Sequence, residues 1–115
     1  MEKNEFLPIG TVVMLKDGKK RVMITGFLSM TGEENNKKVY DYSGCIYPEG
    51  FLSSNQVCLF DHEQIETVYF KGFIDSEETS FKIKLNELAD SLKKGENITN
   101  LHDVIEGDAN KVDSL

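Results

Sequence analysis

The densest run of aromatic residues in the chain is YDYSGCIYPEGF at positions 40–51. It holds three of the four tyrosines, a proline, two glycines and a phenylalanine. This run is too aromatic for a flexible linker and too often interrupted by Gly and Pro for one regular element. We therefore predict a strand over 38–46 that leads directly into a shaped turn over 47–50.

The residues before this run predict a β-hairpin. Residues 11–15 are almost continuously apolar, which is typical of a buried strand. Residues 16–19 contain Asp-Gly, a pair that accepts the positive φ values of tight hairpin turns. The second strand spans 20–28, and Gly26 within it indicates a bulge or a close backbone approach. Its inward side chains are expected to be Val22, Ile24 and Phe27.

The residues after the run predict three more elements, and beyond them the spacing of the apolar residues changes to that of a helix. A short apolar run covers 57–60, and residues 61–65 fit one helical turn in which Asp61 and Gln64 have the capping-box spacing. Residues 66–73 return to a strand pattern. In this strand we expect Val68, Phe70 and Phe73 to face inward.

The last regular element predicted is an amphipathic helix over residues 76–94. Its apolar stripe follows helical spacing and consists of Phe81, Leu85, Leu88 and Leu92. Asp75 or Ser76 can cap the helix, and Gly95 is well placed to end it. Ile83 lies off the stripe, so either it faces a partner or an extended 81–83 precedes a later helix start. We favour the first alternative.

Together these elements predict an α+β fold for residues 1–95. Short antiparallel strands separated by Gly-containing turns favour a small half-open β-barrel, SH3-like, with one C-terminal amphipathic helix packed on one side. Residues 96–115 hold five acidic residues, one lysine and only a weak apolar pattern. We expect this segment to be an acidic, weakly structured tail.

Composition narrows the class of partner. The 115-residue chain has a formal net charge of −7, and residues 43–115 carry fourteen acidic residues against six basic ones. Nucleic acids and anionic membranes select basic surfaces, so a protein partner is expected instead. No apolar run approaches the ~20 residues of a membrane span. With no export signal evident, we expect a cytoplasmic protein whose two cysteines are reduced and buried.

No catalytic or metal-binding pattern stands out. Cys45 follows a glycine, but the motif of a hydrolase nucleophile elbow is absent, and we interpret it as a buried strand residue. Only Cys58 and His62 have a tight ligand spacing, whereas zinc sites use close pairs from both sides. We therefore predict a protein that is not an enzyme and that binds no metal or cofactor.

The aromatic side chains of 40–51 are the most distinctive surface candidates. Tyr40 and Tyr42 share one strand face by alternation, and Tyr47 and Phe51 bracket the Pro48 turn. Two interpretations stay open: these rings cover the open end of a small barrel, or they form an interaction patch with large contact area and little entropy to lose. The partner-binding residues that we predict are Tyr40, Tyr42, Tyr47, Pro48, Phe51 and Ile83.

Three segments together resemble a known family. They are LPIGTVVMLK at 7–16, YDYSGCIYPEG at 40–50 and FDHEQIETVYFKGF at 60–73. In this order and spacing they resemble small domains of unknown function from Gram-positive bacteria, found beside type VII secretion genes and the LXG toxins that this system exports. The resemblance covers about residues 6–92.

The resemblance implies a role in toxin export. Its expected form is a cytoplasmic accessory, adaptor or chaperone-like protein that binds an LXG toxin or its targeting partners. It implies no catalytic residue. The alternative is an immunity protein whose acidic surface covers the cognate toxin domain.

Overall fold

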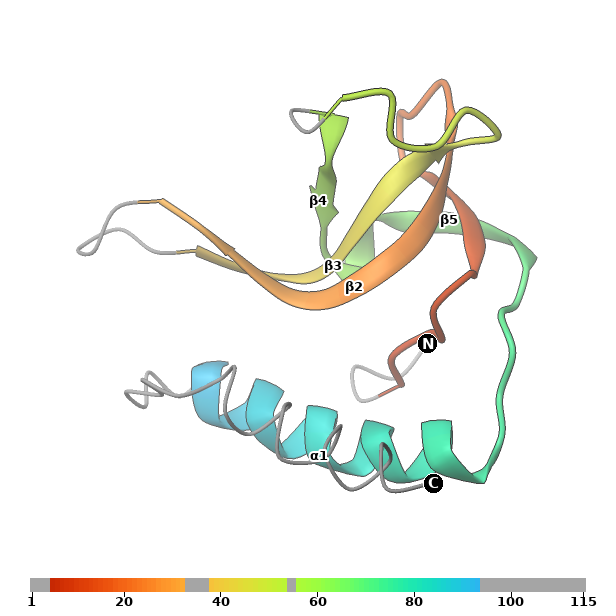
Figure 1. The fold of residues 1–115 in the computed structure, drawn as a ribbon. Coiled ribbons are helices and arrows are strands. Elements are labelled where there is room, and N and C mark those ends of the chain that lie inside the picture. Colours follow the sequence, from red (N-terminus) through yellow and green to blue (C-terminus); the bar gives the residue numbers. More distant parts are fainter. Residues whose placement is uncertain (1–4, 33–37, 54–55, 94–115) are drawn as a thin grey trace.

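The computed structural model describes residues 5–32, 38–53 and 56–93, which form an α+β fold of five antiparallel strands and one helix (Figure 1). The strand order in the sheet is β4-β3-β2-β1-β5. The elements are β1 (Val12–Leu15), β2 (Arg21–Thr31), β3 (Lys38–Tyr47), β4 (Cys58–Phe60), the 3-10 helix η2 (His62–Gln64), β5 (Ile65–Phe70) and α1 (Ser76–Lys93). The predicted helix stop at Gly95 and the predicted acidic tail lie outside the described residues.

The sheet has to curl, because its two edge strands are neighbours in sequence. A flat sheet of five strands would hold β4 and β5 about 19 Å apart. The link between them contains the single turn η2, which advances only ~6 Å. Figure 1 shows β2 and β3 sharply bent, as this constraint demands. Among the described strands β4 and β5 do not pair, so the sheet is not closed into a barrel.

The first hairpin forms as predicted, with one difference in its turn. Val13 pairs with Val22, and the Gly18 amide donates a hydrogen bond of 2.9 Å to the Leu15 carbonyl. The residue with positive φ is Asp17, at 62°, and not the following glycine. Aspartate tolerates this left-handed conformation better than most residues, so the Asp-Gly pair supplies the turn through its first member.

Of the two alternatives predicted for Gly26, the structure shows the bulge. The register between β2 and β3 shifts between Ile24 and Gly26. A Cβ atom at Gly26 would lie 2.5 Å from Ser43 Oγ, so its close neighbour is a side chain and not a backbone. Beyond the bulge, Leu28 has a φ of 50° and its side chain is buried beside the half-buried Phe27.

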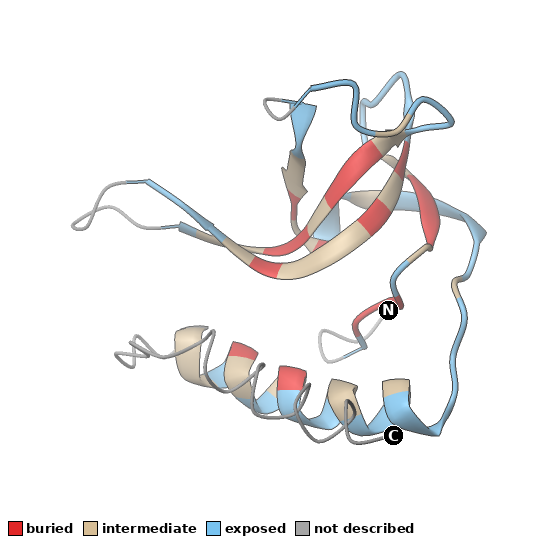
Figure 2. Ribbon diagram, in the orientation of Figure 1, coloured by how far each residue is buried: buried red, intermediate tan, exposed pale blue. Residues whose placement is uncertain are grey.

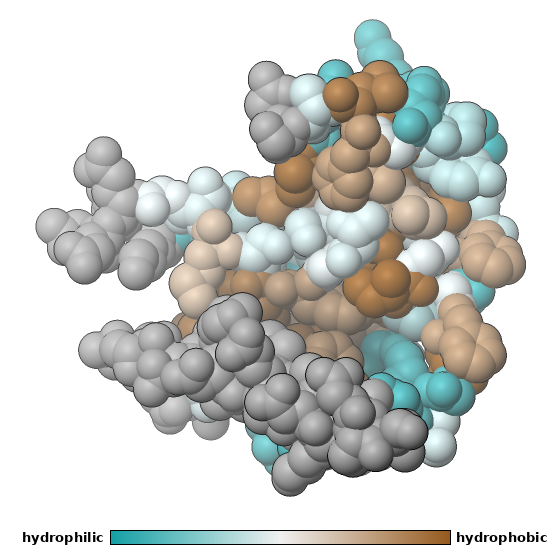
Figure 3. Space-filling view, in the orientation of Figure 1, coloured by the Kyte–Doolittle hydropathy of each residue, from teal (hydrophilic) through white to brown (hydrophobic). Residues whose placement is uncertain are grey.

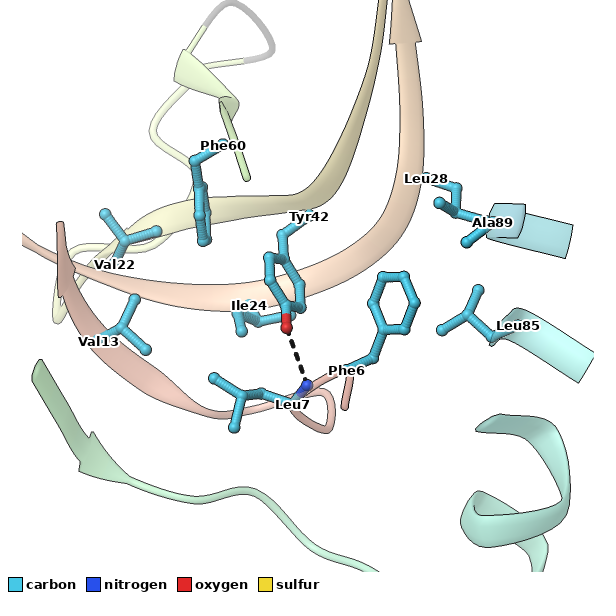
Figure 4. Packing of buried hydrophobic residues seen from close by; sticks show 10 residues of the cluster. All are labelled: Phe6, Leu7, Val13, Val22, Ile24, Leu28, Tyr42, Phe60, Leu85 and Ala89. Atoms are coloured by element: carbon cyan, nitrogen blue, oxygen red, sulfur yellow. Dashed lines mark hydrogen bonds between the residues drawn. The ribbon is translucent and has the colours of Figure 1, made fainter. Parts of the chain in front are cut away.

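The core lies between the concave side of the sheet and α1 (Figures 2 and 4). Val22 and Ile24 come from β2 and Phe60 comes from β4, and α1 contributes Leu85 and Ala89. The predicted helical stripe is confirmed, since Leu85 is buried and the remaining stripe residues pack partly buried against the core: Phe81, Leu88 and Leu92. Asp75 caps the helix through a 2.9 Å bond from the Glu78 amide to its Oδ1.

The prediction that β5 faces the core is wrong. Val68, Phe70 and Phe73 are all exposed. Strict alternation fails because β5 carries two extra residues, Glu66 and Tyr69, against β1. The pairs that define these bulges are Leu15 with Ile65, Met14 with Thr67, Val13 with Val68 and Val12 with Phe70. Each bulge reverses the face of the following side chains.

Tyr42 lies at the centre of the core, and its side chain is completely buried (Figure 4). Its hydroxyl oxygen accepts a 3.0 Å hydrogen bond from the Leu7 amide and lies 2.7 Å from His62 Nδ1. Its ring stacks on Phe60 at 5.4 Å between centroids and meets the edge of Phe6 at 5.7 Å. The side chain therefore joins the N-terminal segment, β3 and η2.

Asp41, the residue before Tyr42, holds the same turn through hydrogen bonds that involve backbone amides. The Asp41 Oδ2 atom accepts a 2.9 Å bond from the His62 amide, and the Asp41 amide donates a 3.0 Å bond to Asp61 Oδ1. The Asp61 amide in turn donates to Gln64 Oε1 at 2.8 Å, which is one half of the predicted capping box. Adjacent residues of β3, Asp41 and Tyr42, thus hold the start of the turn that links the two sheet edges.

Replacing the buried hydroxyl tests this junction. In Tyr42→Phe the Leu7 amide and His62 Nδ1 lose a partner inside the core, and we expect the free energy of unfolding to fall by about 1–3 kcal/mol. Urea denaturation measures this loss. The control is Tyr47→Phe on the exposed turn, for which a change within ~0.5 kcal/mol is expected. Equal losses in both variants would contradict the structural role of Tyr42.

The protonation of His62 predicts a pH dependence of stability. Burial lowers the pKa of His62, although the nearby Asp41 carboxylate opposes this effect. The unfolded chain regains the ordinary pKa of about 6.5, so it binds the proton more readily than the folded chain. The contribution to stability is full above pH ~6.5 and declines as the pH falls through the folded pKa.

We expect this decline to be smaller in His62→Gln, because glutamine does not titrate. Urea denaturation of both proteins between about pH 7.5 and 5 measures the two slopes. The carboxylates and His102 are common to both proteins, so they cancel in the difference. Parallel slopes would show that His62 does not titrate differently on folding.

Candidate partner-binding surface

The turn that follows β3 is held by backbone and side-chain contacts. The Gly50 amide donates a 2.8 Å bond to the Ile46 carbonyl, and these two residues also form an isolated β-bridge. Gly50 has a φ of 77°, a conformation that favours glycine. The Tyr47–Pro48 peptide bond within the turn is cis. The hydrogen bond and the bridge between Ile46 and Gly50 close the turn at its base.

Two cations of the first hairpin fasten the turn to the sheet. Lys20 Nζ lies 2.7 Å from Glu49 Oε2, and this hydrogen bond lowers the pKa of the exposed Glu49 carboxyl. Arg21, which pairs with Tyr47 across β2 and β3, places its guanidinium carbon 5.2 Å from the centroid of the tyrosine ring. This distance is within the range of a cation–π contact.

The apolar side chains of this turn point outward. Tyr47 is 37% exposed, Phe51 52% and Leu52 66%, and Pro48 is exposed as well. Figure 3 shows hydrophobic surface over the connection between β3 and β4, at the top of the view. We call residues 47–52 the aromatic turn. Of the two interpretations left open, its exposure favours an interaction patch over a barrel cover.

The other predicted partner-binding residues lie elsewhere. Tyr42 is buried in the core, so it is not part of the candidate surface. Tyr40 is half-buried near the far end of β3, and Lys38 Nζ lies 4.6 Å from its ring centroid. Ile83 is exposed on α1, which begins at Ser76, so the alternative of an extended 81–83 is excluded. The structure therefore brings together Tyr47, Pro48 and Phe51 only.

A second exposed apolar segment was not predicted. It runs from β5 into the connection to α1 and consists of Val68, Tyr69, Phe70, Phe73 and Ile74. We call these residues the β5 strip. Their apolar character is visible in the sequence, but a strand pattern does not reveal that the strand is an edge with a bulged register.

The cysteine thiols, the Tyr42 hydroxyl and the His62 imidazole lie in the core or pack against it. Cys45 is buried in β3, whereas Cys58 is only partly buried, and desolvation together with Cys45 raises the pKa of its thiol. Burial raises the pKa of Tyr42 as well, so its hydroxyl keeps its proton. The same hydroxyl lies 2.7 Å from His62 Nδ1, and the tautomer of the imidazole decides which of the two groups donates. In the described part of the chain, no group of three His, Cys, Asp or Glu could hold a metal ion.

Among the described residues, no helix has the length and the apolar character that crossing a membrane requires.

Comparisons with known proteins identify one family. No match to the chain was found among curated proteins or among solved structures. Residues 6–81, which include all five strands and the first turns of α1, match the domain of unknown function DUF4176, and the chain belongs to this family.

Proposed function

We propose that this domain is a non-enzymatic binding protein that holds a protein partner on its aromatic turn. The observation that carries the proposal is the exposure of Tyr47, Phe51 and Leu52 on a turn whose backbone is fixed. Exposed aromatic side chains on a preorganised segment lose little entropy on binding and bury a large area. Exposed Pro48 adds to the same surface.

The charge around the turn suits a protein partner. The Lys20–Glu49 ion pair and the Arg21–Tyr47 contact place both signs of charge beside the apolar residues, as in the polar rim of an interface. The chain as a whole carries a net charge of −7. A partner with a basic rim would therefore be attracted over a longer range, whereas a nucleic acid would be repelled.

The resemblance described above suggests the identity of the partner. We propose that the domain acts in the cytoplasm as an accessory, adaptor or chaperone-like protein for an LXG toxin exported by type VII secretion. Ile83 and Tyr40 belong to the proposed contacts only for a partner large enough to reach β3 and α1 as well. The alternative, an immunity protein, is favoured by the acidic charge, which would complement a basic toxin active site.

We also propose that the curled sheet is a half-open barrel of the SH3-like type. The support is topological: five short antiparallel strands, with β4 and β5 joined through a single 3-10 turn at opposite edges. In this arrangement the aromatic turn connects the third and fourth strands and lies outside the barrel interior.

A double substitution separates binding from stability. In Tyr47→Ala with Phe51→Ala, we expect partner binding to weaken by at least about tenfold, since aromatic residues dominate interface energies. The free energy of unfolding should change by no more than ~1 kcal/mol, the value of an exposed cation–π contact. The matched control is Ile9→Ala with Met30→Ala, two exposed apolar residues away from the turn. A large loss of stability in the first variant would make the turn part of the core.

The partner segment distinguishes the two proposed roles. The full chain is co-expressed separately with the N-terminal LXG half and with the C-terminal toxin half of an LXG protein from the same organism. An export accessory captures the LXG half, whereas an immunity protein captures the toxin half and inhibits it. Capture of neither half, under conditions where both are folded, would contradict both roles. Capture should be lost with the Tyr47 and Phe51 double variant.

A further inference from the structure

The β5 strip exposes a large apolar surface within a short segment of the chain. Phe70 is 63% exposed, Phe73 79% and Tyr69 55%, within five residues of sequence. At ~200 Å² for each aromatic residue, these three expose about 400 Å² together. The largest apolar patch on a typical single chain measures about 300–600 Å² and is often functional, so the strip is a candidate contact surface. Val68 and Ile74 extend it at both ends.

From this strip we infer that the chain forms a dimer in which the β5 strips of two copies pack against each other. Two-fold pairing buries the strip twice, so the three aromatic residues and their neighbours would remove about 1,000 Å² from water, the lower limit for a specific interface. A moderately stable dimer is therefore expected, one that dissociates on dilution.

The charges along the strip fit this two-fold arrangement. Lys71 lies at one side of Phe73 and Asp75 at the other, two residues away in each direction. When two such segments lie antiparallel about Phe73, Lys71 of each copy comes beside Asp75 of the other. Opposite charges meet twice, although the whole chain carries a net charge of −7. Such local complementarity is what self-association of an acidic protein requires.

The contact is made by side chains and not by extension of the sheet. The two bulges in β5 twist this edge, and bulges of this kind disfavour the addition of another strand. The connection over residues 71–75 has no regular secondary structure and carries the two apolar residues beyond the strand, Phe73 and Ile74. A strand-paired dimer would leave these two side chains in water.

The oligomeric state of the full chain tests the inference. Analytical ultracentrifugation from micromolar to millimolar concentration should show a shift from the 13.0 kDa of one chain to twice that mass. In Phe70→Lys with Phe73→Lys, the dissociation constant should rise by about tenfold or more. The matched control, Phe51→Lys with Leu52→Lys, changes two exposed apolar residues of the aromatic turn and should leave the dissociation constant of the dimer unchanged.

A single charge reversal provides a second variant that leaves the apolar residues intact. Lys71→Glu should weaken the dimer, most strongly at low salt, whereas Lys19→Glu on the exposed hairpin turn should not. Circular dichroism confirms that each variant is folded. A chain that stays at the mass of one copy up to millimolar concentration overturns the inference. So does a dimer that loses no stability in either β5 variant, or that loses as much in the aromatic-turn control.

Discussion

The hydroxyl group of Tyr42 is the point at which the fold is closed. It accepts a hydrogen bond from the Leu7 amide and lies within hydrogen-bond distance of His62 Nδ1. It therefore joins segments that are 35 and 20 residues away in sequence. The sheet edges can approach each other only if η2 turns tightly, and the Asp41 carboxylate holds the amide of His62 in that turn. Phe6 then packs against Tyr42 and fills the space beneath the sheet. One buried phenol thus links the N-terminal segment, strand β3 and the 3-10 turn between the two edge strands.

The three segments that carry the family resemblance meet in these same contacts. Leu7 comes from the first, Tyr42 from the second and His62 from the third. A further contact joins the first and third, because the Gly72 amide donates a 3.0 Å bond to Thr11 Oγ1 and a Cβ atom at Gly72 would collide with the Ile9 carbonyl. These three segments therefore supply contacts that close the fold. None of these contacts lies in the aromatic turn, and membership in DUF4176, a domain of unknown function, does not define a binding site.

Much of the secondary structure could be predicted, because period and turn chemistry are local. The bulge at Gly26, the cap at Asp75 and the stripe of α1 follow from a few neighbouring residues. The burial of Tyr42 could not be predicted, since Tyr40 and Tyr42 have the same residue type and strand phase, and only the arrival of Phe6, Phe60 and His62 distinguishes them. The prediction for β5 failed for a related reason. Its two bulges depend on pairing with β1, and they reverse the faces that simple alternation assigns to its side chains.

The two exposed surfaces belong to different strands of the sheet. The aromatic turn follows β3, whereas the β5 strip begins on the edge strand β5, and β2 and β1 lie between these two strands. If two copies join through their β5 strips, the dimer presents two aromatic turns, and a partner with two matching segments would bind with an effective concentration set by their spacing. A weak contact at each turn would then suffice for firm binding, and dilution of the dimer would release the partner.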